Sequence, residues 1–224
     1  MTSTCTAVGA ADTTGVLNKM QIERRACGNE DVSIDVSFCG ICHSDLHQLR
    51  GEWPQTVVYP MVPGHEVVGV VRAVGKDVTR FAVGDRVGVG CMVDSCRACD
   101  NCKDDQENYC TMGNAPTYNG LTTPDRTATQ GGYSQRIVVA ESFVLHIPDS
   151  LDLASAAPLL CAGITTYSPL VYHGAKAKGK DAKVGVVGFG GLGHMCAKIS
   201  LAMGNAVVVF STSEAKRAHV NPTP

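Results

Sequence analysis

Four cysteines fall within fifteen residues, and they constrain the fold of this chain more than any other feature. They are Cys96, Cys99, Cys102 and Cys110, in the spacing C-x2-C-x2-C-x7-C. A loop this short buries little apolar surface, so a tetrahedral Zn²⁺ held by four thiolates would supply the missing folding free energy. An iron–sulfur run closes with C-x3-C-P, whereas here the last gap is seven residues and Thr111 follows. Unrelated free or disulfide-bonded cysteines are the other alternative, and the short, regular gaps favour structural zinc.

Charge and composition exclude several classes of function. The chain has 224 residues and a formal net charge of −2, enough for one large domain or two small ones. Acidic residues outnumber basic ones around the cysteine cluster, which argues against a zinc module that binds nucleic acid. We expect no secretion signal at residues 1–10 and no contact with a membrane, because no run of about 18 apolar residues occurs. Eleven cysteines without such a signal predict a reducing, cytoplasmic compartment and metal ligation.

The first 150 residues consist mostly of short strand patterns and turns. Val32, Ile34, Val36 and Phe38 alternate with polar residues, which is typical of a half-buried strand. Further β-rich runs cover residues 67–71, 86–89 and 134–139, and glycines separate them. Many short strands with glycine turns predict a barrel-like all-β domain, which we place at residues 1–152.

The pattern changes to α/β after residue 152. Residues 153–167 are rich in Ala and Leu and predict a helix, whereas residues 175–183 indicate a basic, polar linker. Apolar runs at 184–187 and 206–210 predict two strands, joined by a glycine loop and a helix. The predicted apolar face of that helix contains Leu192, Met195, Cys196, Ile199, Ala202 and Met203. We therefore predict a second, partial dinucleotide-binding domain at residues 153–224.

The glycine loop between these strands has the sequence Gly188-Phe-Gly190-Gly191-Leu192-Gly193. Its position after a strand and before a helix is the context that a dinucleotide site requires. Gly188 permits the tight turn, Gly190 lets the pyrophosphate approach the backbone, and Gly193 lets the helix pack closely on the strand. The helix start then offers N–H groups and positive dipole to phosphates. A glycine loop without a ligand is the less favoured alternative.

The end of the second strand predicts which dinucleotide binds. An NAD site usually places Asp or Glu there, but this chain has Ser211-Thr212-Ser213, followed by Lys216 and Arg217. Hydroxyls and cations suit a ribose 2′-phosphate, and we expect no acidic residue at the strand end to repel it. The pattern favours NADP(H), with a solvated polar turn as a fair competitor.

Several motifs together resemble the zinc-dependent medium-chain alcohol dehydrogenases. They include 40–47, with Cys42, Ser44, Asp45 and His47, then Gly64-His65-Glu66, the GGYS sequence at 131–134 and the segment 157–167 around Cys161. The resemblance is strongest to the cinnamyl-alcohol dehydrogenase branch and its NADP-dependent aldehyde reductases, and it runs from about residue 7 to residue 217. It implies a GroES-like β-barrel followed by the first part of a Rossmann domain. Zinc-free quinone reductases share this fold but lack both cysteine sets.

The resemblance implies a second zinc site, in addition to the cysteine lobe. Cys42, His65 and Cys161 would ligate a catalytic zinc, because a set of two cysteines and one histidine leaves the fourth position open for water or substrate. Glu66 would lie next to the metal and assist ligand exchange. Asp45 would orient His65.

The same resemblance assigns the reacting groups. Ser44 would exchange a proton with the substrate oxygen, and His47 would form the outer end of a relay that includes the cofactor ribose. Thr165 would lie near the nicotinamide. Zinc would polarise an aldehyde oxygen while NADPH delivers hydride, and alcohol oxidation is the reverse. Trp53 and Tyr118 are candidate walls of an apolar substrate pocket, with ordinary packing at least as good an explanation.

The resemblance stops after Lys216 and Arg217, where a member of this family would continue its helix. Pro222 and Pro224 would not continue one. We expect a truncated copy of the enzyme whose two parallel strands expose apolar surface, with 207–210 as an unprotected edge. The enzyme acting on a small alcohol or aldehyde, homodimeric in its full-length form, is one interpretation. An inactive zinc-binding fragment that associates with a full-length subunit is the other.

Overall fold

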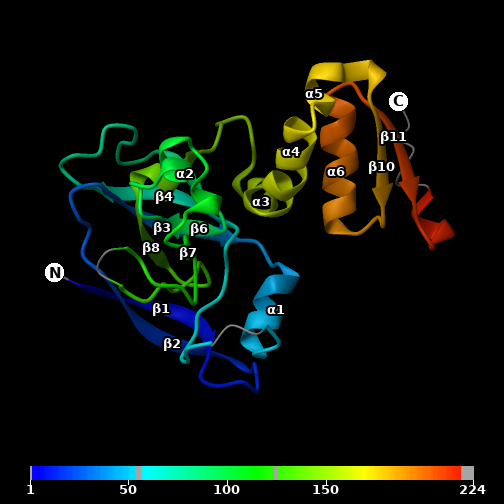
Figure 1. Cartoon of the computed structure of the whole chain (residues 1–224). Helices are drawn as coiled ribbons and strands as arrows, with labels where there is room; N and C mark the ends of the chain where they lie inside the picture. The colour runs from blue at the N-terminus through cyan, green and yellow to red at the C-terminus, as the bar shows by residue number, and fades with distance from the viewer. Residues whose placement is uncertain (1, 54–56, 124–125, 218–224) are drawn as a thin grey trace. The chain divides into compact units, whose positions relative to one another are not determined.

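The computed structural model describes residues 2–53, 57–123 and 126–217. Two compact units divide the chain, Met1–Leu160 and Cys161–Pro224, and each is described separately. Figure 1 labels their helices and strands. Pro222 and Pro224, which we expect to end the last helix, lie outside the described residues.

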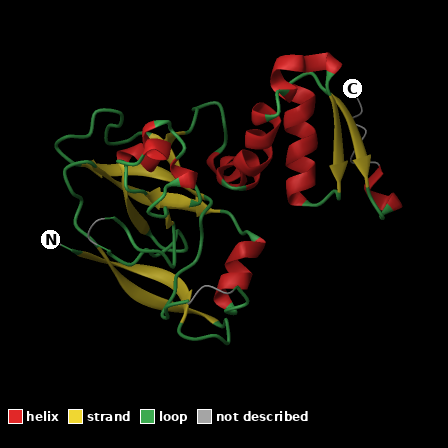
Figure 2. Cartoon of the chain, in the orientation of Figure 1, coloured by secondary structure: helices red, strands yellow, loops and turns green. Residues whose placement is uncertain are grey.

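The first unit is built on a five-stranded antiparallel sheet with the strand order β8-β3-β4-β5-β9. Its strands are β8 (Arg136–Ala140), β3 (Asp31–Cys39), β4 (Val67–Val74), β5 (Arg86–Val89) and β9 (Leu145–His146). Two small antiparallel sheets accompany it: β1 (Ser3–Ala10) with β2 (Leu17–Arg24), and β6 (Met92–Asp94) with β7 (Ala115–Pro116). Figure 2 shows these strands in yellow, joined by long loops. The predicted strands at 32–38, 67–71 and 86–89 are confirmed, and β8 begins two residues later than predicted.

The main core of the first unit lies on one face of this sheet. Val32, Ile34, Val67 and Val87 are fully buried there. Phe38, expected on the same buried face of β3, is instead 50% exposed. The register between β3 and β4 shifts between Val36 and Phe38, and such a bulge interrupts the alternation of inward and outward side chains. This part of the strand prediction was wrong.

The helix predicted over 153–167 is broken into three parts. They are α3 (Leu153–Ala156), the 3₁₀ turn η3 (Ala157–Leu160) and α4 (Ala162–Tyr172). Pro158 falls in the 3₁₀ turn, where it has no N–H to donate to the preceding turn. Ala156, Ala157 and Leu160 pack around Val68 of β4. Because of this packing, the units divide after Leu160 rather than at the predicted boundary after residue 152.

The second unit is a short β-α-β arrangement flanked by helices. It contains β10 (Lys183–Val187), α6 (Gly191–Ala202) and β11 (Ala206–Phe210), and the two strands pair in parallel. The segment 175–183 is not the predicted linker, because it forms α5 (Ala175–Lys178) and the turn η4 (Gly179–Asp181). Ala175 and Ala182 are buried there, in a core that α4, β10 and α6 share.

The predicted apolar face of α6 is only partly correct. Cys196, Ile199 and Met203 pack against the core of the second unit, whereas Leu192 is 49% exposed. The parallel strands also expose apolar side chains, as expected: Val187 is 87% exposed, and Val208 and Phe210 are more than half exposed. The last described element is the 3₁₀ turn η5 (Glu214–Lys216).

Candidate metal centre and cofactor loop

The short helix α1 (His43–Leu49) carries three of the predicted site residues. Cys42 is its N-cap, and the Cys42 N–H donates to Asp45 Oδ2 at 3.0 Å. This capping bond satisfies a helix-start N–H and turns the Asp45 carboxylate back toward the start of the helix. The capped helix start therefore fixes Cys42, Ser44 and Asp45 relative to one another.

Cys42 meets His65 and Glu66, which lie directly before β4. The candidate ligand atoms of the three residues lie within 4.8 Å of one another, and both His65 and Glu66 are buried. Thiolate, imidazole and carboxylate are the ligands that zinc takes in proteins, so the donor set fits this metal. Cys161, the second cysteine of the predicted ligand set, is the first residue of the second unit and directly follows buried Leu160.

Asp45 is the hydrogen-bond acceptor that connects the start of α1 with the residues before β4. Its side chain is almost fully buried. Oδ1 accepts from the Gly64 N–H at 3.1 Å and lies 3.3 Å from His65 Nδ1. Burial alone raises the pKa of Asp45, but the hydrogen bonds from His65 and from the Cys42 N–H outweigh it and hold that pKa below its usual range. The carboxylate is therefore ionised and is placed to hold the Nδ1–H of His65, as expected from the sequence.

Glu66 is fitted closely into the same site. The Gly40 N–H donates to the Glu66 carbonyl at 2.9 Å. A Cβ on Gly40 would collide with the Glu66 carboxylate, so a larger residue there would displace that side chain. Burial raises the pKa of Glu66, and the nearby His65 partly opposes that shift. A cation beside such a buried carboxyl would stabilise its ionised form, and raised pKa values of this kind are typical of functional sites.

Ser44 and His47 extend from this centre along α1. Ser44 Oγ lies 3.5 Å from Cys42 Sγ. His47 Nδ1 lies 2.7 Å from Glu52 Oε2, and its ring stacks on Trp53 with centroids 5.4 Å apart. Glu52 is a site residue that the sequence reasoning missed, although an acid five residues after a candidate relay histidine was the available signal. The contact described for Trp53, a candidate wall of the substrate pocket, is therefore its stacking on the His47 ring.

Two tyrosines that the sequence reasoning did not place in the metal centre also reach it. Tyr133 donates its hydroxyl to Asp45 Oδ2 at 3.0 Å. Tyr118 is buried, stacks on His65 with centroids 5.6 Å apart, and forms a hydrogen bond with Asp45. Burial, followed by the Asp45 charge, raises the pKa of both phenols, so each stays a neutral donor.

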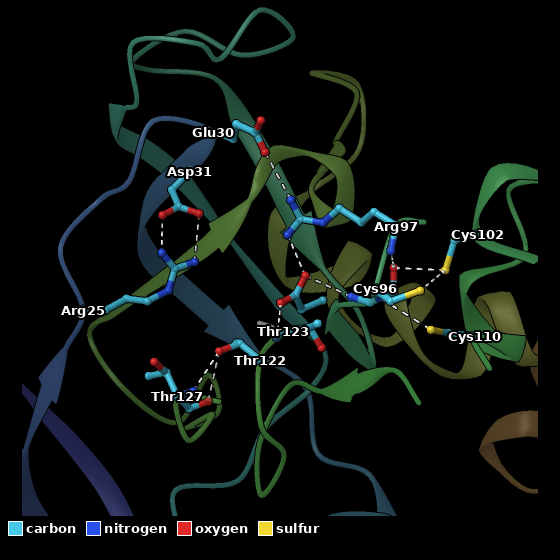
Figure 3. Close-up of polar contacts among 12 residues, drawn as sticks. Arg25, Glu30, Asp31, Cys96, Arg97, Cys102, Cys110, Thr122, Thr123 and Thr127 are labelled. Carbon is cyan, nitrogen blue, oxygen red and sulfur yellow. Dashed lines mark hydrogen bonds and ion pairs between the residues drawn. The ribbon is translucent and has the colours of Figure 1, made fainter. Parts of the chain in front are cut away.

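The four lobe cysteines are brought together as the spacing predicts. Cys96, Cys99, Cys102 and Cys110 place their sulfur atoms within 4.8 Å of one another, around α2 (Asp100–Lys103) and the turn η1 (Glu107–Tyr109). Figure 3 shows Cys96 beside Cys102 and Cys110. Backbone N–H groups of Thr111 and Cys102 lower the pKa of Cys99 to about 5, which favours the thiolate that zinc binds. This set of four thiols fits a closed, structural zinc site.

An ion-pair network joins this lobe to the sheet. Arg97 donates to Asp94 Oδ1 at 2.6 Å and to Glu30 Oε2 at 3.2 Å, and Figure 3 shows it reaching Glu30. Asp94 is buried and also accepts from the Thr123 N–H at 2.7 Å. The loop between Cys96 and Cys99 is therefore tied both to β6 and to the turn before β3.

The glycine loop has the geometry predicted for it. Gly188 has a φ of +85° and donates its N–H to the Phe210 carbonyl at 2.8 Å. A Cβ on Gly193 would collide with the Gly188 carbonyl, whereas Cβ atoms on Gly190 and Gly191 would meet nothing within 4 Å. Leu192 follows in the first turn of α6, where it is half exposed. The loop therefore leaves open space at the start of a twelve-residue helix, which suits an incoming phosphate.

The polar turn after β11 requires one correction. Ser211, Thr212 and Ser213 follow the strand as expected, and the Ser213 N–H donates to Ser211 Oγ at 3.2 Å. However, Glu214 in η5 pairs with Arg217 at 2.9 Å, so an acidic residue does lie near the strand end and Arg217 is partly neutralised. Thr165 is exposed on α4 and lines a separate hollow whose lining includes none of the loop glycines.

Comparison with known proteins identifies the class. A sequence model described as the alcohol dehydrogenase GroES-like domain matches residues 28–149, which is more than half of the chain. The chain belongs to this family. These residues contain the main sheet, most of the metal centre and the whole cysteine lobe.

Individual relatives refine this assignment. The chain is 56% identical over 212 residues to the NADP-dependent alcohol dehydrogenase C 1 of Mycolicibacterium smegmatis, covering 94% of this chain and 59% of that protein. It is 57% identical over 212 residues to the aldehyde reductase YahK of Escherichia coli, with the same coverage. The cinnamyl alcohol dehydrogenase SbCAD4 of Sorghum bicolor matches with a TM-score of 0.91 and 47% identity, covering 97% of this chain and 61% of that one.

A cinnamyl alcohol dehydrogenase of Helicobacter pylori, solved in complex with NADP(H), matches with a TM-score of 0.90 and 44% identity, covering 98% of this chain and 62% of that one. These findings confirm the predicted family and fold, a GroES-like domain followed by part of a Rossmann domain. The chain spans about three fifths of the length of these relatives. Among the described residues, no single helix is long and apolar enough to cross a membrane, and only the pair Leu153–Leu160 and Ala162–Tyr172 meets that criterion together.

Proposed function

We propose that this chain carries the metal centre and the first part of the cofactor site of a zinc-dependent oxidoreductase, which interconverts primary alcohols and aldehydes with NADP(H). The observation that carries the proposal is the set of half-buried Cys42 with buried His65 and Glu66, in which Asp45 holds the Cys42 N–H and His65. Cys161 would complete a set of two cysteines and one histidine, and its backbone begins one peptide bond from Leu160, which is buried in the first unit. Relatives whose names state NADP-dependent alcohol dehydrogenase or aldehyde reductase activity support the same interpretation.

The residues around this centre have distinct tasks in the proposed reaction. When bound, zinc supplies Lewis-acid polarisation of the substrate oxygen, and NADPH supplies the hydride. Ser44 presents a hydroxyl beside Cys42, where it would pass a proton to or from the substrate oxygen. Glu52 holds His47 through Nδ1, so Nε2 is the nitrogen left to exchange a proton with water. Trp53 restricts the rotation of the His47 ring by stacking on it.

Two zinc ions and one NADP(H) are the proposed cofactors. Zinc in the lobe would be structural, because four thiolates close its coordination shell. The glycine loop would hold the pyrophosphate, while the turn Ser211–Thr212–Ser213 and Lys216 would contact the ribose 2′-phosphate. Arg217 would contribute less, because Glu214 already pairs with it. We also propose a cytoplasmic location, since none of the eleven cysteines forms a disulfide.

A second candidate is a non-catalytic zinc-binding chain that associates with a longer subunit. The exposed apolar residues of β10 and β11 favour it, because a parallel sheet is normally covered on both faces. Such a chain would keep the lobe zinc and need no cofactor.

The test is zinc content together with NADPH-dependent reduction of an aromatic aldehyde by the purified chain. The proposed function predicts two zinc ions per chain and turnover, and it predicts that His65→Ala loses one zinc and all turnover. A matched control is His146→Ala, because His146 lies in β9 and belongs to neither metal cluster. One zinc per chain without turnover, unchanged in His65→Ala, would support the second candidate instead.

A further inference from the structure

The GGYS sequence at 131–134 has no role in the proposed reaction, yet the structure builds it directly against the metal centre. Three backbone bonds tie it to the segment that precedes His65. Gly131 donates to the Val62 carbonyl at 2.7 Å, Gly132 to the Gly64 carbonyl at 2.8 Å and Tyr133 to the Pro63 carbonyl at 3.0 Å. Residues 131–133 therefore run alongside residues 62–64 and have little freedom to move away from them.

The close approach of these segments explains the glycines. A Cβ on Gly131 would collide with the Pro63 carbonyl, and a Cβ on Gly132 would collide with the Val67 side chain. Gly64 has a φ of +102°, and a Cβ there would meet the Tyr133 ring at 2.6 Å. The ring thus lies directly on the residue before His65, in a space that only glycine leaves open.

From this position the Tyr133 hydroxyl divides the hydrogen bonds of Asp45 between its two oxygens. Oδ2 accepts from Tyr133 and from the Cys42 N–H, both at 3.0 Å. Oδ1 faces the Gly64 N–H and His65 Nδ1, and Tyr118 also forms a hydrogen bond with the same carboxylate. A carboxylate bonded on both oxygens cannot twist about its Cβ–Cγ bond without losing partners, so its plane is fixed.

We propose that Tyr133 is a positioning residue for the metal centre, acting through Asp45 on the orientation of the His65 ring. The inference rests on the proposed function, because it concerns the same metal site. With Nδ1–H directed at Asp45 Oδ1, the Nε2 lone pair of His65 points away from Asp45 and is available to a metal. Without the hydroxyl, Asp45 keeps the hydrogen bonds from Cys42, Gly64 and Tyr118 but loses one of the two bonds described on Oδ2. The carboxylate is then held less firmly against twisting, and His65 samples orientations that do not ligate more often.

The test measures loss of zinc from the purified, zinc-loaded chain to a colorimetric chelator in excess. The kinetic phase that is missing in His65→Ala belongs to the catalytic site, and the other phase belongs to the cysteine lobe. We expect Tyr133→Phe to release the catalytic zinc about 10-fold faster, the lower end for groups that orient a metal ligand. The lobe phase should not change, because no lobe cysteine contacts Tyr133 in the hydrogen bonds described. Tyr59→Phe is the matched control, since its hydroxyl donates to the Leu49 carbonyl and not to Asp45.

A double-mutant cycle separates positioning from general loosening of the structure. If Tyr133 acts through Asp45, the effects of Tyr133→Phe and Asp45→Asn on zinc release are not additive, because the second change removes what the first acts on. Additive effects, equal acceleration of both zinc phases, or an unchanged catalytic phase would each overturn the inference.

A measurement on the unmodified chain covers the case in which Tyr133→Phe does not fold. With labelled tyrosine, the NMR signal of the Tyr133 side chain should shift when the catalytic zinc is removed, while that of Tyr59 should not. No shift at Tyr133 would overturn the inference. If the unmodified chain has no catalytic zinc phase at all, the proposed function itself fails. If instead the unmodified chain shows the catalytic zinc phase and Tyr133→Phe leaves that phase unchanged, only the inference about Tyr133 fails.

Discussion

Replacing Asp45 tests how strongly one buried carboxylate organises the metal centre. Five donors converge on it: the Cys42 and Gly64 N–H groups, His65 Nδ1, and the hydroxyls of Tyr133 and Tyr118. In Asp45→Asn the amide oxygen can serve Gly64 and His65, but the NH₂ group then faces the Cys42 N–H. A buried donor without a partner costs about 1–3 kcal/mol, so we expect a loss of about 2 kcal/mol in the free energy of unfolding.

Asp45→Ala removes more of the side chain and gives a second expected change in the free energy of unfolding. Asp45→Ala removes the acceptor for all five donors, and at about 0.8 kcal/mol for each the loss is about 4 kcal/mol. That is a large share of the roughly 5–15 kcal/mol by which domains are usually stable. Both variants are compared in zinc-free buffer with a chelator, so that metal binding does not enter the comparison.

Urea unfolding followed by Trp53 fluorescence is a suitable assay, because Trp53 is the only tryptophan and belongs to the first unit. With a urea dependence of about 2 kcal/mol per M, the midpoint should fall by about 1 M for Asp45→Asn and about 2 M for Asp45→Ala. Asp35→Asn is the matched control, because Asp35 is half exposed and its described ion pairs are with exposed Arg72 and partly buried Arg136. Equal midpoints for Asp45→Asn and Asp35→Asn would refute the reasoning.

Three further predictions address the other parts of the chain. Cys102→Ser should lower the zinc content by one per chain and leave the His65-dependent zinc in place; loss of both metals, measured by elemental analysis, would contradict separate sites. Gly193→Ala should abolish NADPH binding measured by fluorescence titration, because its Cβ meets the Gly188 carbonyl. Asp152 caps α3 by accepting from a backbone N–H, which lowers its pKa; its stabilising effect should therefore be complete above the unfolded-state pKa near 4 and vanish as pH falls through the lower folded-state value, so thermal midpoints of Asp152→Ala and the parent chain should converge in acid and differ at neutral pH.

The sequence predicted those parts of the site that depend on local spacing. The lobe cysteines, the glycine loop and the Cys42–Asp45 helix start are each contained in a few residues, so their pattern is visible without a fold. Tyr133 reaches Asp45 across 88 positions of sequence, and only the pairing of 131–133 with 62–64 brings them together. Glu52 is only five residues from His47, but its contact with His47 depends on the path of the chain after α1, which the sequence does not show.

The errors in the predicted fold have a similar origin. In β3, Val32 and Ile34 are buried as the alternation predicts, but Ser33 between them is buried as well and Phe38 is exposed. The register against β4 shifts near both of these residues. The segment 175–183 has a polar sequence, but Ala175 and Ala182 turn inward, and Asn205 supports it by donating to the Ala175 and Gly179 carbonyls. In both cases a tertiary contact decided what the local pattern left open.

The two metal clusters differ in what holds them together, and this sets the order in which they would fill. Hydrogen bonds within the protein already connect Cys42, Gly64 and Tyr133 through Asp45, so the pocket around His65 keeps its shape before any ion arrives. In the lobe, four thiols lie within 4.8 Å of one another, and the neighbouring apolar side chains of Tyr109 and Met112 are exposed. Arg97 ties the start of the lobe to Asp94 and Glu30, but the proposed ion would be what holds its four thiols together, whereas ions could be exchanged at the His65 site while the surrounding sheet stays folded. A newly made chain would thus take up its lobe metal as a step of folding and its catalytic metal as an ordinary ligand.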